Sequence, residues 1–117
     1  MIDDERSIAE DLTDWGKVAL IETVGRTTAR PARAAIGFID EPEGSMLIAA
    51  GSDDADWALN LRANPTCRVT IGDKTTTCVA HEVDGDDRSR AITGLILKYG
   101  TPAERLGRGP VFRLTPT

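Results

Sequence analysis

The chain has 117 residues, which is enough for one domain with a real hydrophobic core and too few for two. Hydrophobic residues make up 40% of it and charged residues 28%, as in ordinary soluble globular proteins. The formal net charge of −5 argues against a nucleic-acid surface, and no apolar run approaches the length of a membrane span. The opening MIDDERS has neither a basic start nor an apolar stretch, so we expect no secretory signal and a cytoplasmic protein.

The first half of the chain is expected to consist mainly of short strands separated by turn residues. Asp3 to Asp14 has a weak helical pattern. The composition then predicts strands over 17–23 and 33–39 with a loop over 24–31 between them, and a turn over 41–44. A third strand over 45–50 is continuously apolar, which indicates burial on both of its faces.

The stretch SDDADWALNLRANPTCRVTI predicts a short helix followed by a half-buried strand. Ser52 or Asp53 can cap the helix, and the acids that follow place negative charge in its first turn, where the helix dipole favours it. Trp57 and Leu61 share one face at i,i+4. Asn64-Pro65 ends the helix, because the residue before a proline is pushed out of the helical region. The next strand, over 67–71, alternates apolar and polar residues.

A two-residue hairpin turn at Gly72-Asp73 would place Cys67 opposite Cys78 on the strand over 74–83. We expect two small buried residues kept reduced rather than a disulfide, because this register predicts a widely spaced pair. The single histidine, His81, and the lack of a CxxC motif leave too few soft ligands for a metal site. His81 is more simply interpreted as a structural residue.

The second half contains one further helix and a last strand. The helix is expected to open at Asp84 to Asp87 and to end at Tyr99, before Gly100. Gly94 inside it predicts a close approach of backbone or ligand, and the last strand covers 111–114. Together these elements predict a mainly β fold with some helix in a single domain over 1–117. We expect a small barrel of about six mostly antiparallel strands with two or three packed helices.

The loop GRTTARPAR is the clearest candidate for a binding site. Arg26, Arg30 and Arg33 lie within nine residues of an acidic chain, with no acid among them and with Thr27 and Thr28 as hydroxyl donors. Arginine forks, hydroxyls and loop amides together suit a phosphate or carboxylate. A solvated loop whose arginines pair with acids elsewhere is the alternative, and composition alone favours it. No acid–base pair or triad is visible, which suggests that a cofactor would supply any chemistry.

Several motifs in order resemble the deazaflavin-dependent nitroreductase family. They are GRTTARPAR after a strand, LIAAGSDDADW, NLRANPTCRVTIG and the C-terminal PVFRLTP. The resemblance covers residues 20–116, and the pattern of Trp57, Asn60-Leu61, Ala63-Asn64-Pro65 and Val69 carries most of it. Departures from the family pattern are Thr27 in place of a Lys or Arg, Ala29 in place of a Gly, and Ala32 where some members have an arginine.

The resemblance implies a split β-barrel that binds coenzyme F420 and transfers hydride from the reduced deazaflavin to an electron-poor alkene, quinone or nitro compound. The loop over 25–33 would hold the phosphate and polyglutamate tail, and the segment over 49–52 would lie along the ring. The implied cofactor-binding residues are Gly25, Arg26, Thr27, Thr28, Arg30, Arg33, Ala49, Ala50, Gly51, Ser52, Trp57, Asn60 and Tyr99.

Two other functions remain open from the sequence. One is an FMN-binding split-barrel reductase. The other is a non-catalytic module that binds a cofactor or small anion without turnover. In every case the expected partner is a small molecule, and a homodimer is possible because the edges of such a sheet cannot remain bare.

Overall fold

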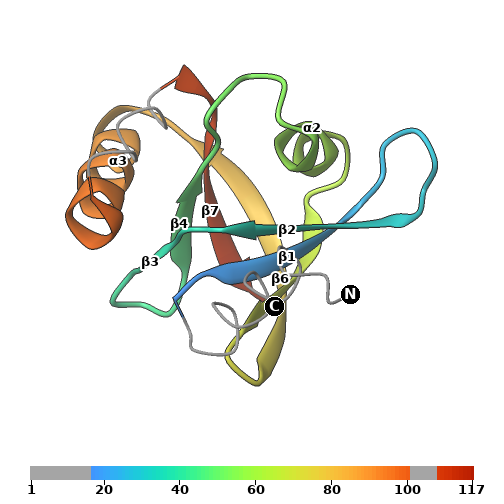
Figure 1. Cartoon of the computed structure of the whole chain (residues 1–117), viewed down its shortest axis with the longest axis horizontal. Helices are drawn as coiled ribbons and strands as arrows, with labels where there is room; N and C mark the ends of the chain where they lie inside the picture. Colours follow the sequence, from blue (N-terminus) through green and yellow to red (C-terminus); the bar gives the residue numbers. More distant parts are fainter. Residues whose placement is uncertain (1–16, 101–107) are drawn as a thin grey trace, which may run out of the picture.

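The computed structural model describes residues 17–100 and 108–117, in which seven strands and two helices form the fold (Figure 1). The expected mainly β class is confirmed. The helix expected over 3–14 lies outside the described residues. The strands are β1 (Ala19–Val24), β2 (Pro31–Ile36), β3 (Ile39–Asp40), β4 (Met46–Ala49), β5 (Thr66–Ile71), β6 (Lys74–Val83) and β7 (Val111–Pro116). The helices are α2 (Asp56–Ala63) and α3 (Gly85–Tyr99).

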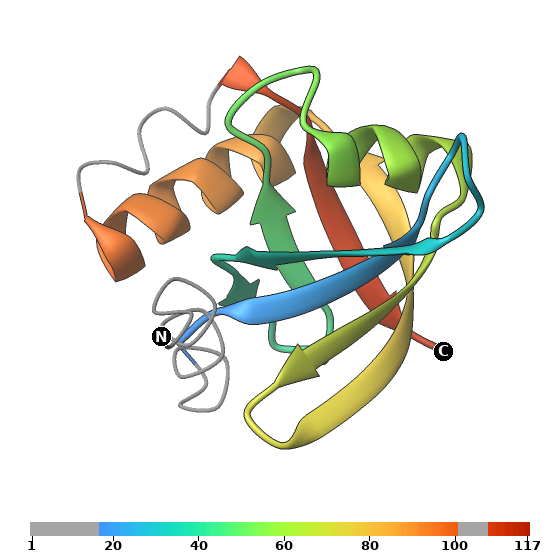
Figure 2. The ribbon, with the colours of Figure 1, turned by 45° about the vertical axis from the view of Figure 1, so that its right-hand side comes forward.

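The order of the strands explains why the sheet curls. All neighbours in the sheet are antiparallel, and the order is β2-β1-β5-β6-β7-β4-β3. The two end strands, β2 and β3, are consecutive in the chain and are separated by Gly37 and Phe38 alone. A link this short can be made only if the sheet bends until its ends meet. Figure 2 shows the resulting curled sheet, which confirms the split β-barrel.

This closure also corrects one expectation, because the single strand expected over 33–39 is two strands. The chain turns a corner of the barrel at Gly37, and Phe38 is buried there with an exposed fraction of 3%. A Cβ at Gly37 would lie 2.9 Å from the ring of Tyr99, so only glycine lets α3 approach the corner this closely.

Two hydrophobic cores lie on the two faces of β4. Met46 and Ile48 belong to the core inside the barrel, whereas Leu47 and Ala49 belong to a second core beneath α3. Successive residues of a strand point to opposite faces, and here both faces are covered. This confirms that the apolar run over 45–50 is buried on both sides. In Figure 1, α3 lies beside β3 and β4, and α2 lies near the β1–β2 hairpin.

The β5–β6 hairpin has the register expected from its turn. Ile71 pairs with Lys74, and Cys67 pairs with Cys78. Both cysteines are buried free thiols. Burial, and then the charge of Cys78, raises the pKa of Cys67 to about 12, so the thiol stays protonated at neutral pH.

The start of α2 differs from the expected one. The helix begins at Asp56, after Ala55 in the N-cap position, and no side chain caps it. Asp53 and Asp54 lie in the turn before the helix, and Asp56 alone provides an acid in the first turn. The end of the helix is confirmed, because Asn64 before Pro65 is extended with φ at −145°.

Helix α3 has the expected limits. The Asp84 side chain accepts a hydrogen bond from the Gly85 N–H, and Gly100 follows the last turn with φ at 97°. The close approach at Gly94 comes from the side chain of Ile39, whose Cδ1 would lie 2.6 Å from an added Cβ. The sequence analysis expected backbone or ligand there, so this assignment was wrong.

A cluster of four charged residues joins α3 to the sheet. Glu41, whose side chain is 5% exposed, accepts hydrogen bonds from Arg113 Nε at 2.7 Å and from Arg90 Nη1 at 3.0 Å. Asp87 accepts from Arg90 and, at 3.1 Å, from Arg113. These contacts hold the turn before β4, strand β7 and helix α3 together. The hydrogen bond from Arg113, followed by that from Arg90, holds the pKa of Glu41 below its ordinary value of 4.5.

The loop between β1 and β2 is tightly closed. Gly25 N–H donates to Arg30 O at 2.8 Å, and Ala29 N–H donates to Gly25 O at 2.8 Å. A Cβ on Gly25 would lie 2.8 Å from Thr28 Oγ1 and 3.0 Å from Arg30 O, so the loop has no room for one. Ala29 adopts φ at 59°, in the left-handed region, which costs a residue with a Cβ about 1 to 2 kcal/mol.

We expect Glu41→Gln to lower the free energy of unfolding by about 2 kcal/mol at neutral pH, because a charged acceptor of two arginines is lost. Chemical denaturation would measure the loss, with the exposed Glu43→Gln as control. Since the folded pKa of Glu41 lies below the unfolded one, its contribution is complete above pH 4.5 and is lost as the pH falls further. The difference in free energy of unfolding between wild type and Glu41→Gln should therefore become smaller as the pH falls below 4.5. A difference that does not change with pH would contradict this role of Glu41.

We expect Ala29→Gly to raise the free energy of unfolding by about 0.5 to 1 kcal/mol, because relief of the left-handed strain outweighs the added freedom of the unfolded chain. The control is Ala35→Gly, at an exposed position in the middle of β2, which should destabilise the protein by a similar amount. Thermal unfolding of both variants would measure these changes. A loss of stability in Ala29→Gly would show that the strain is not relieved.

Candidate functional site

A buried polar contact joins the arginine loop to α2. The side chain of Asn60 is on α2 with an exposed fraction of 3%, and its Nδ2 donates to Thr23 Oγ1 on β1 at 3.0 Å. Its Oδ1 accepts from Arg26 N–H at 3.1 Å and from Arg26 Nη1 at 2.8 Å. Thr23 is 1% exposed and points inward with Ile21, as the alternation of β1 requires. We call these three residues, Thr23, Arg26 and Asn60, the clasp.

The guanidinium of Arg26 is hydrogen-bonded through its terminal nitrogens, and the edge that contains Nε is open. Besides Asn60, its Nη1 donates to Asp56 O at 3.4 Å, and its Nη2 donates to Asp56 Oδ1 at 3.2 Å. These contacts use three of its five N–H groups. Within the described part of the chain, the Nε–H and one Nη2–H have no partner. That pair is the edge with which an arginine binds a carboxylate or phosphate in two-point fashion.

The segment that follows β4 is supported from behind by a glycine. Ala49 and Ala50 are buried, whereas Gly51 and Ser52 are exposed. Ala50 N–H donates to Pro110 O at 2.9 Å. A Cβ at Gly109 would lie 2.6 Å from both Ala50 O and Ser52 O, so the absence of a side chain lets the two backbones pack. The segment thus presents its exposed backbone beside the start of α2.

Trp57, on α2, packs against the apolar core of the barrel. It is half-buried against the barrel core, and its ring centroid lies 6.0 Å from that of Phe112, with the planes tilted by 58°. Its neighbour Asp56 contacts Arg26, so α2 brings Trp57 and Asn60 together with Arg26. Ala50, from the segment over 49–52, belongs to the same core against which Trp57 packs. An open arginine edge and a half-buried aromatic ring, both at α2, suit a ligand with a flat ring and an anionic tail.

Other implied site residues lie elsewhere. Arg33 points to the outer face of the sheet, where it pairs with Glu22 at 2.9 Å, and Arg68 lies 3.8 Å from the same carboxylate. These residues line a shallow hollow of about 220 Å³. Thr27 and Arg30 are exposed near the tip of the hairpin, and Thr28 Oγ1 accepts from Arg30 N–H at 3.2 Å. The arginines of the loop GRTTARPAR therefore do not all lie on the same face of the hairpin.

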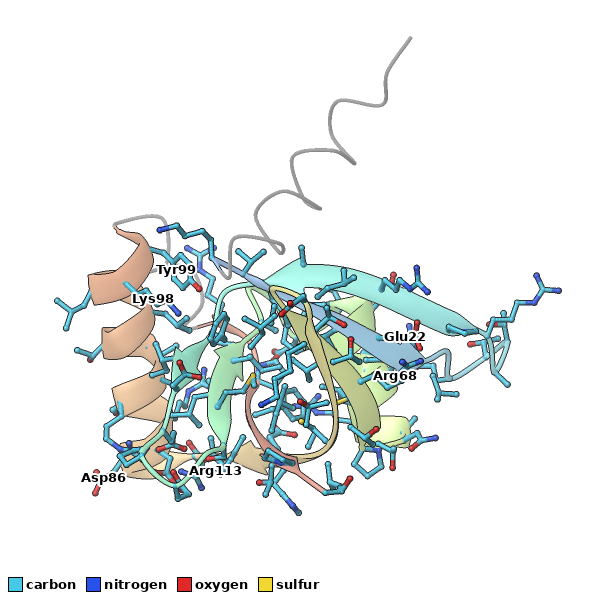
Figure 3. All side chains as sticks on the ribbon, turned by 90° about the horizontal axis from the view of Figure 1, so that it is seen from below. Glu22, Arg68, Asp86, Lys98, Tyr99 and Arg113 are labelled. Atoms are coloured by element: carbon cyan, nitrogen blue, oxygen red, sulfur yellow. The ribbon has the colours of Figure 1, made fainter. Side chains whose placement is uncertain are left out.

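Tyr99 is also separate from the clasp. Its hydroxyl donates to Lys17 O at 2.6 Å and accepts from Phe38 N–H at 3.1 Å, so it ties α3 to the barrel corner. Lys17 precedes β1 and Arg26 follows it, which places Tyr99 and Arg26 at opposite ends of that strand. Figure 3 shows Tyr99 and Lys98 on one side of the molecule and Glu22 and Arg68 on the other.

Sequence reasoning missed Thr23 and Gly109. An inward-facing threonine in a strand otherwise directed at an apolar core is a signal for a buried polar partner, and it was present in β1. Gly109 had no comparable signal, because its role depends on the backbone of Ala50 and Ser52, which follow β4. Among residues 17–100 and 108–117, no group of three or more His, Cys, Asp or Glu could hold a metal ion. The helices in these ranges are too short or too polar to cross a membrane.

Comparison with known proteins identifies the family. A model described as "F420H(2)-dependent quinone reductase" matches residues 4–106. The solved structure of an F420-H2 dependent reductase, FDR-A, aligns with a TM-score of 0.70 and 25% identity, over 84% of this chain and 93% of that one.

Two more distant structures share the fold. HutZ, the heme storage protein from Vibrio cholerae, aligns with a TM-score of 0.72 and 22% identity, over 98% of this chain and 89% of that one. A putative pyridoxamine 5′-phosphate oxidase from Listeria innocua aligns with a TM-score of 0.66 and 15% identity, over 97% and 91%. The deazaflavin-dependent family, F420 as its cofactor and the split barrel, all expected from the motifs, are confirmed. The chain belongs to the F420H2-dependent quinone reductase family of oxidoreductases.

Proposed function

We propose that this protein is a reductase that uses reduced F420 to reduce a quinone. The observation that carries the proposal is the open edge of Arg26, held by Asn60 and Asp56 of α2, in a chain whose family model spans residues 4–106. Membership in a family of F420H2-dependent quinone reductases supports a quinone over the alkene and nitro acceptors that the sequence left open.

The residues of the site bind and orient, and the bound cofactor supplies the redox chemistry. When bound, F420H2 supplies two electrons and two protons in all, so that a quinone becomes a hydroquinone and F420 is left oxidised. Arg26 would bind an oxyanion of the cofactor through its Nε–H and Nη2–H. Gly51 and Ser52 would lie along the ring with their backbone, and Trp57 would border it.

Charge near the site both favours and opposes an anionic cofactor. The arginine loop provides positive charge in a chain whose formal net charge is −5. Asp56, which is 87% exposed, lies next to Arg26 and partly neutralises it. Solvent screens an exposed carboxylate strongly, whereas the two-point bond of an arginine to an oxyanion is directional and short. We therefore expect net attraction at the open edge of Arg26.

The function can be tested by titrating the purified protein with F420, followed by the fluorescence of the deazaflavin, with FMN in parallel. We expect F420 to bind at micromolar or lower concentration and FMN to bind much more weakly. Oxidation of F420H2 should then be measured with quinone, nitro and activated alkene acceptors in turn. Fastest turnover with quinones supports the proposal. Tight binding of F420 without turnover of any acceptor would favour a carrier module, and preferential FMN binding would contradict the proposal.

We expect Arg26→Ala to weaken F420 binding by about 1.5 to 3 kcal/mol, because a charged two-point hydrogen bond is lost. Arg33→Ala is the matched control from the same loop, since Arg33 faces the outer side of the sheet and pairs with Glu22. Its effect should be below about 0.5 kcal/mol. Equal losses in the two variants would show that charge alone, rather than the placement of Arg26, attracts the cofactor.

The homodimer that the sequence analysis allowed stays a prediction. Strand β2 is at one end of the sheet and pairs with β1 along one edge only.

A further inference from the structure

The amide of Asn60 is enclosed by protein rather than exposed to a ligand. Its side-chain oxygen accepts two hydrogen bonds from Arg26, which is the full capacity of an amide oxygen. Its nitrogen donates to Thr23, and the residue is 3% exposed. The resemblance to the family implied that Asn60 contacts the cofactor. The structure instead directs the polar atoms of Asn60 toward the hairpin.

Asn60 holds Arg26 through two hydrogen bonds. One oxygen accepts both the backbone N–H and the Nη1–H of the same arginine, which closes a ring through its side chain. A free arginine side chain loses rotamer entropy when it is fixed. In this protein much of that loss occurs on folding. An arginine that is already fixed binds an oxyanion more tightly than a mobile one with the same charge.

The hydrogen bonds to Asn60 also determine which edge of the Arg26 guanidinium faces outward. Asp56 accepts from Nη1 through its backbone oxygen, in a long, exposed contact of 3.4 Å. It accepts from Nη2 through its carboxylate, whose side chain is 87% exposed, so both contacts are weak anchors. Asn60 is the buried anchor. With the two of them in place, the Nε–H and one Nη2–H remain for a ligand, and these two donors lie parallel.

We propose that Asn60 is a positioning residue, which directs the open edge of Arg26 toward an oxyanion of F420 and does not touch the cofactor itself. The inference rests on the proposed role of Arg26 in binding F420. The oxyanion belongs to the phosphate or to a glutamate carboxylate of the cofactor, since both present the two acceptor oxygens that this edge fits.

A double-mutant cycle tests the proposal. Asn60→Ala would be made in the wild type and in Arg26→Ala, and each protein would be titrated with F420 and with the deazaflavin riboside that lacks the phosphate and glutamates. We expect Asn60→Ala alone to weaken F420 binding about tenfold, because the hydrogen bonds that orient a charged group are lost. In the Arg26→Ala background it should add less than about twofold, and neither substitution should change riboside binding.

Two further variants separate positioning from folding. Glu41→Gln is destabilised at a distance from the clasp and should bind F420 as the wild type does. Arg26→Lys changes a partly exposed residue, so it should fold even if Asn60→Ala does not. Lysine keeps the charge but has no fork, and we therefore expect it to lose most of the affinity that Arg26→Ala loses.

Each contrary result is informative. An equal effect of Asn60→Ala with and without Arg26, or a loss of riboside binding, would show that Asn60 acts through the fold or contacts the cofactor. Wild-type affinity in Arg26→Lys would show that orientation is unimportant. A loss with Arg26→Ala and none with Asn60→Ala would overturn only this inference. Wild-type affinity in Arg26→Ala would overturn the role of Arg26 and, with it, that of Asn60.

Discussion

The short link between β2 and β3 is the constraint on which the rest of the structure depends. Because two residues join the strands at opposite ends of the sheet, the sheet has to close on itself. Closure creates an enclosed core and leaves β4 between that core and α3. The corner is secured by Tyr99 and by Lys98, whose Nζ lies 3.7 Å from the centre of the Phe38 ring and donates to Phe38 O at 2.8 Å. A β-branched or large residue at Gly37 would exclude Tyr99 and open this corner.

The clasp and the charged cluster around Glu41 have different functions in this barrel, although both are polar contacts in an apolar setting. The cluster joins elements that already pack through the second core, so it adds stability and fixes the position of α3. The clasp joins a hairpin tip to a helix that is only eight residues long. The hydrogen bonds of Asn60 with Thr23 and Arg26 are directional and fix the geometry of that junction. This difference is why the clasp is suited to orienting a binding residue.

Much of the fold follows from local sequence. The alternation of apolar and polar residues, with the turn residues, was sufficient to predict strands β1, β5 and β6. The two-residue turn fixed the pairing of Cys67 with Cys78. The division of the strand over 33–39 could not be predicted, because it results from barrel closure, which involves residues far apart in the chain. The acids before α2 suggested an earlier start, but neither Ser52 nor Asp53 caps the helix in the structure.

The candidate site was predicted less completely, for a related reason. The resemblance implied which segments form the site, but three arginines within nine residues of sequence do not show which face of a hairpin each one occupies. Register decides this: Arg33 pairs with Glu22 across the ladder and faces outward, whereas Arg26 lies beyond the last pair and turns toward α2. Asn60 appeared as part of a motif, and the role proposed for it comes only from its three side-chain hydrogen bonds to Arg26 and Thr23.

The placement of β4 has a consequence for how the site can respond to a ligand. The exposed segment at Gly51 and Ser52 continues directly from a strand whose two faces are both covered, and Gly109 supports its backbone from behind. If the flat ring of the cofactor binds here as proposed, such a segment has little conformational freedom left to lose. The barrel would then act as a rigid template at this point, and adaptation to acceptors of different shape would have to come from the side where Trp57 is only half-buried.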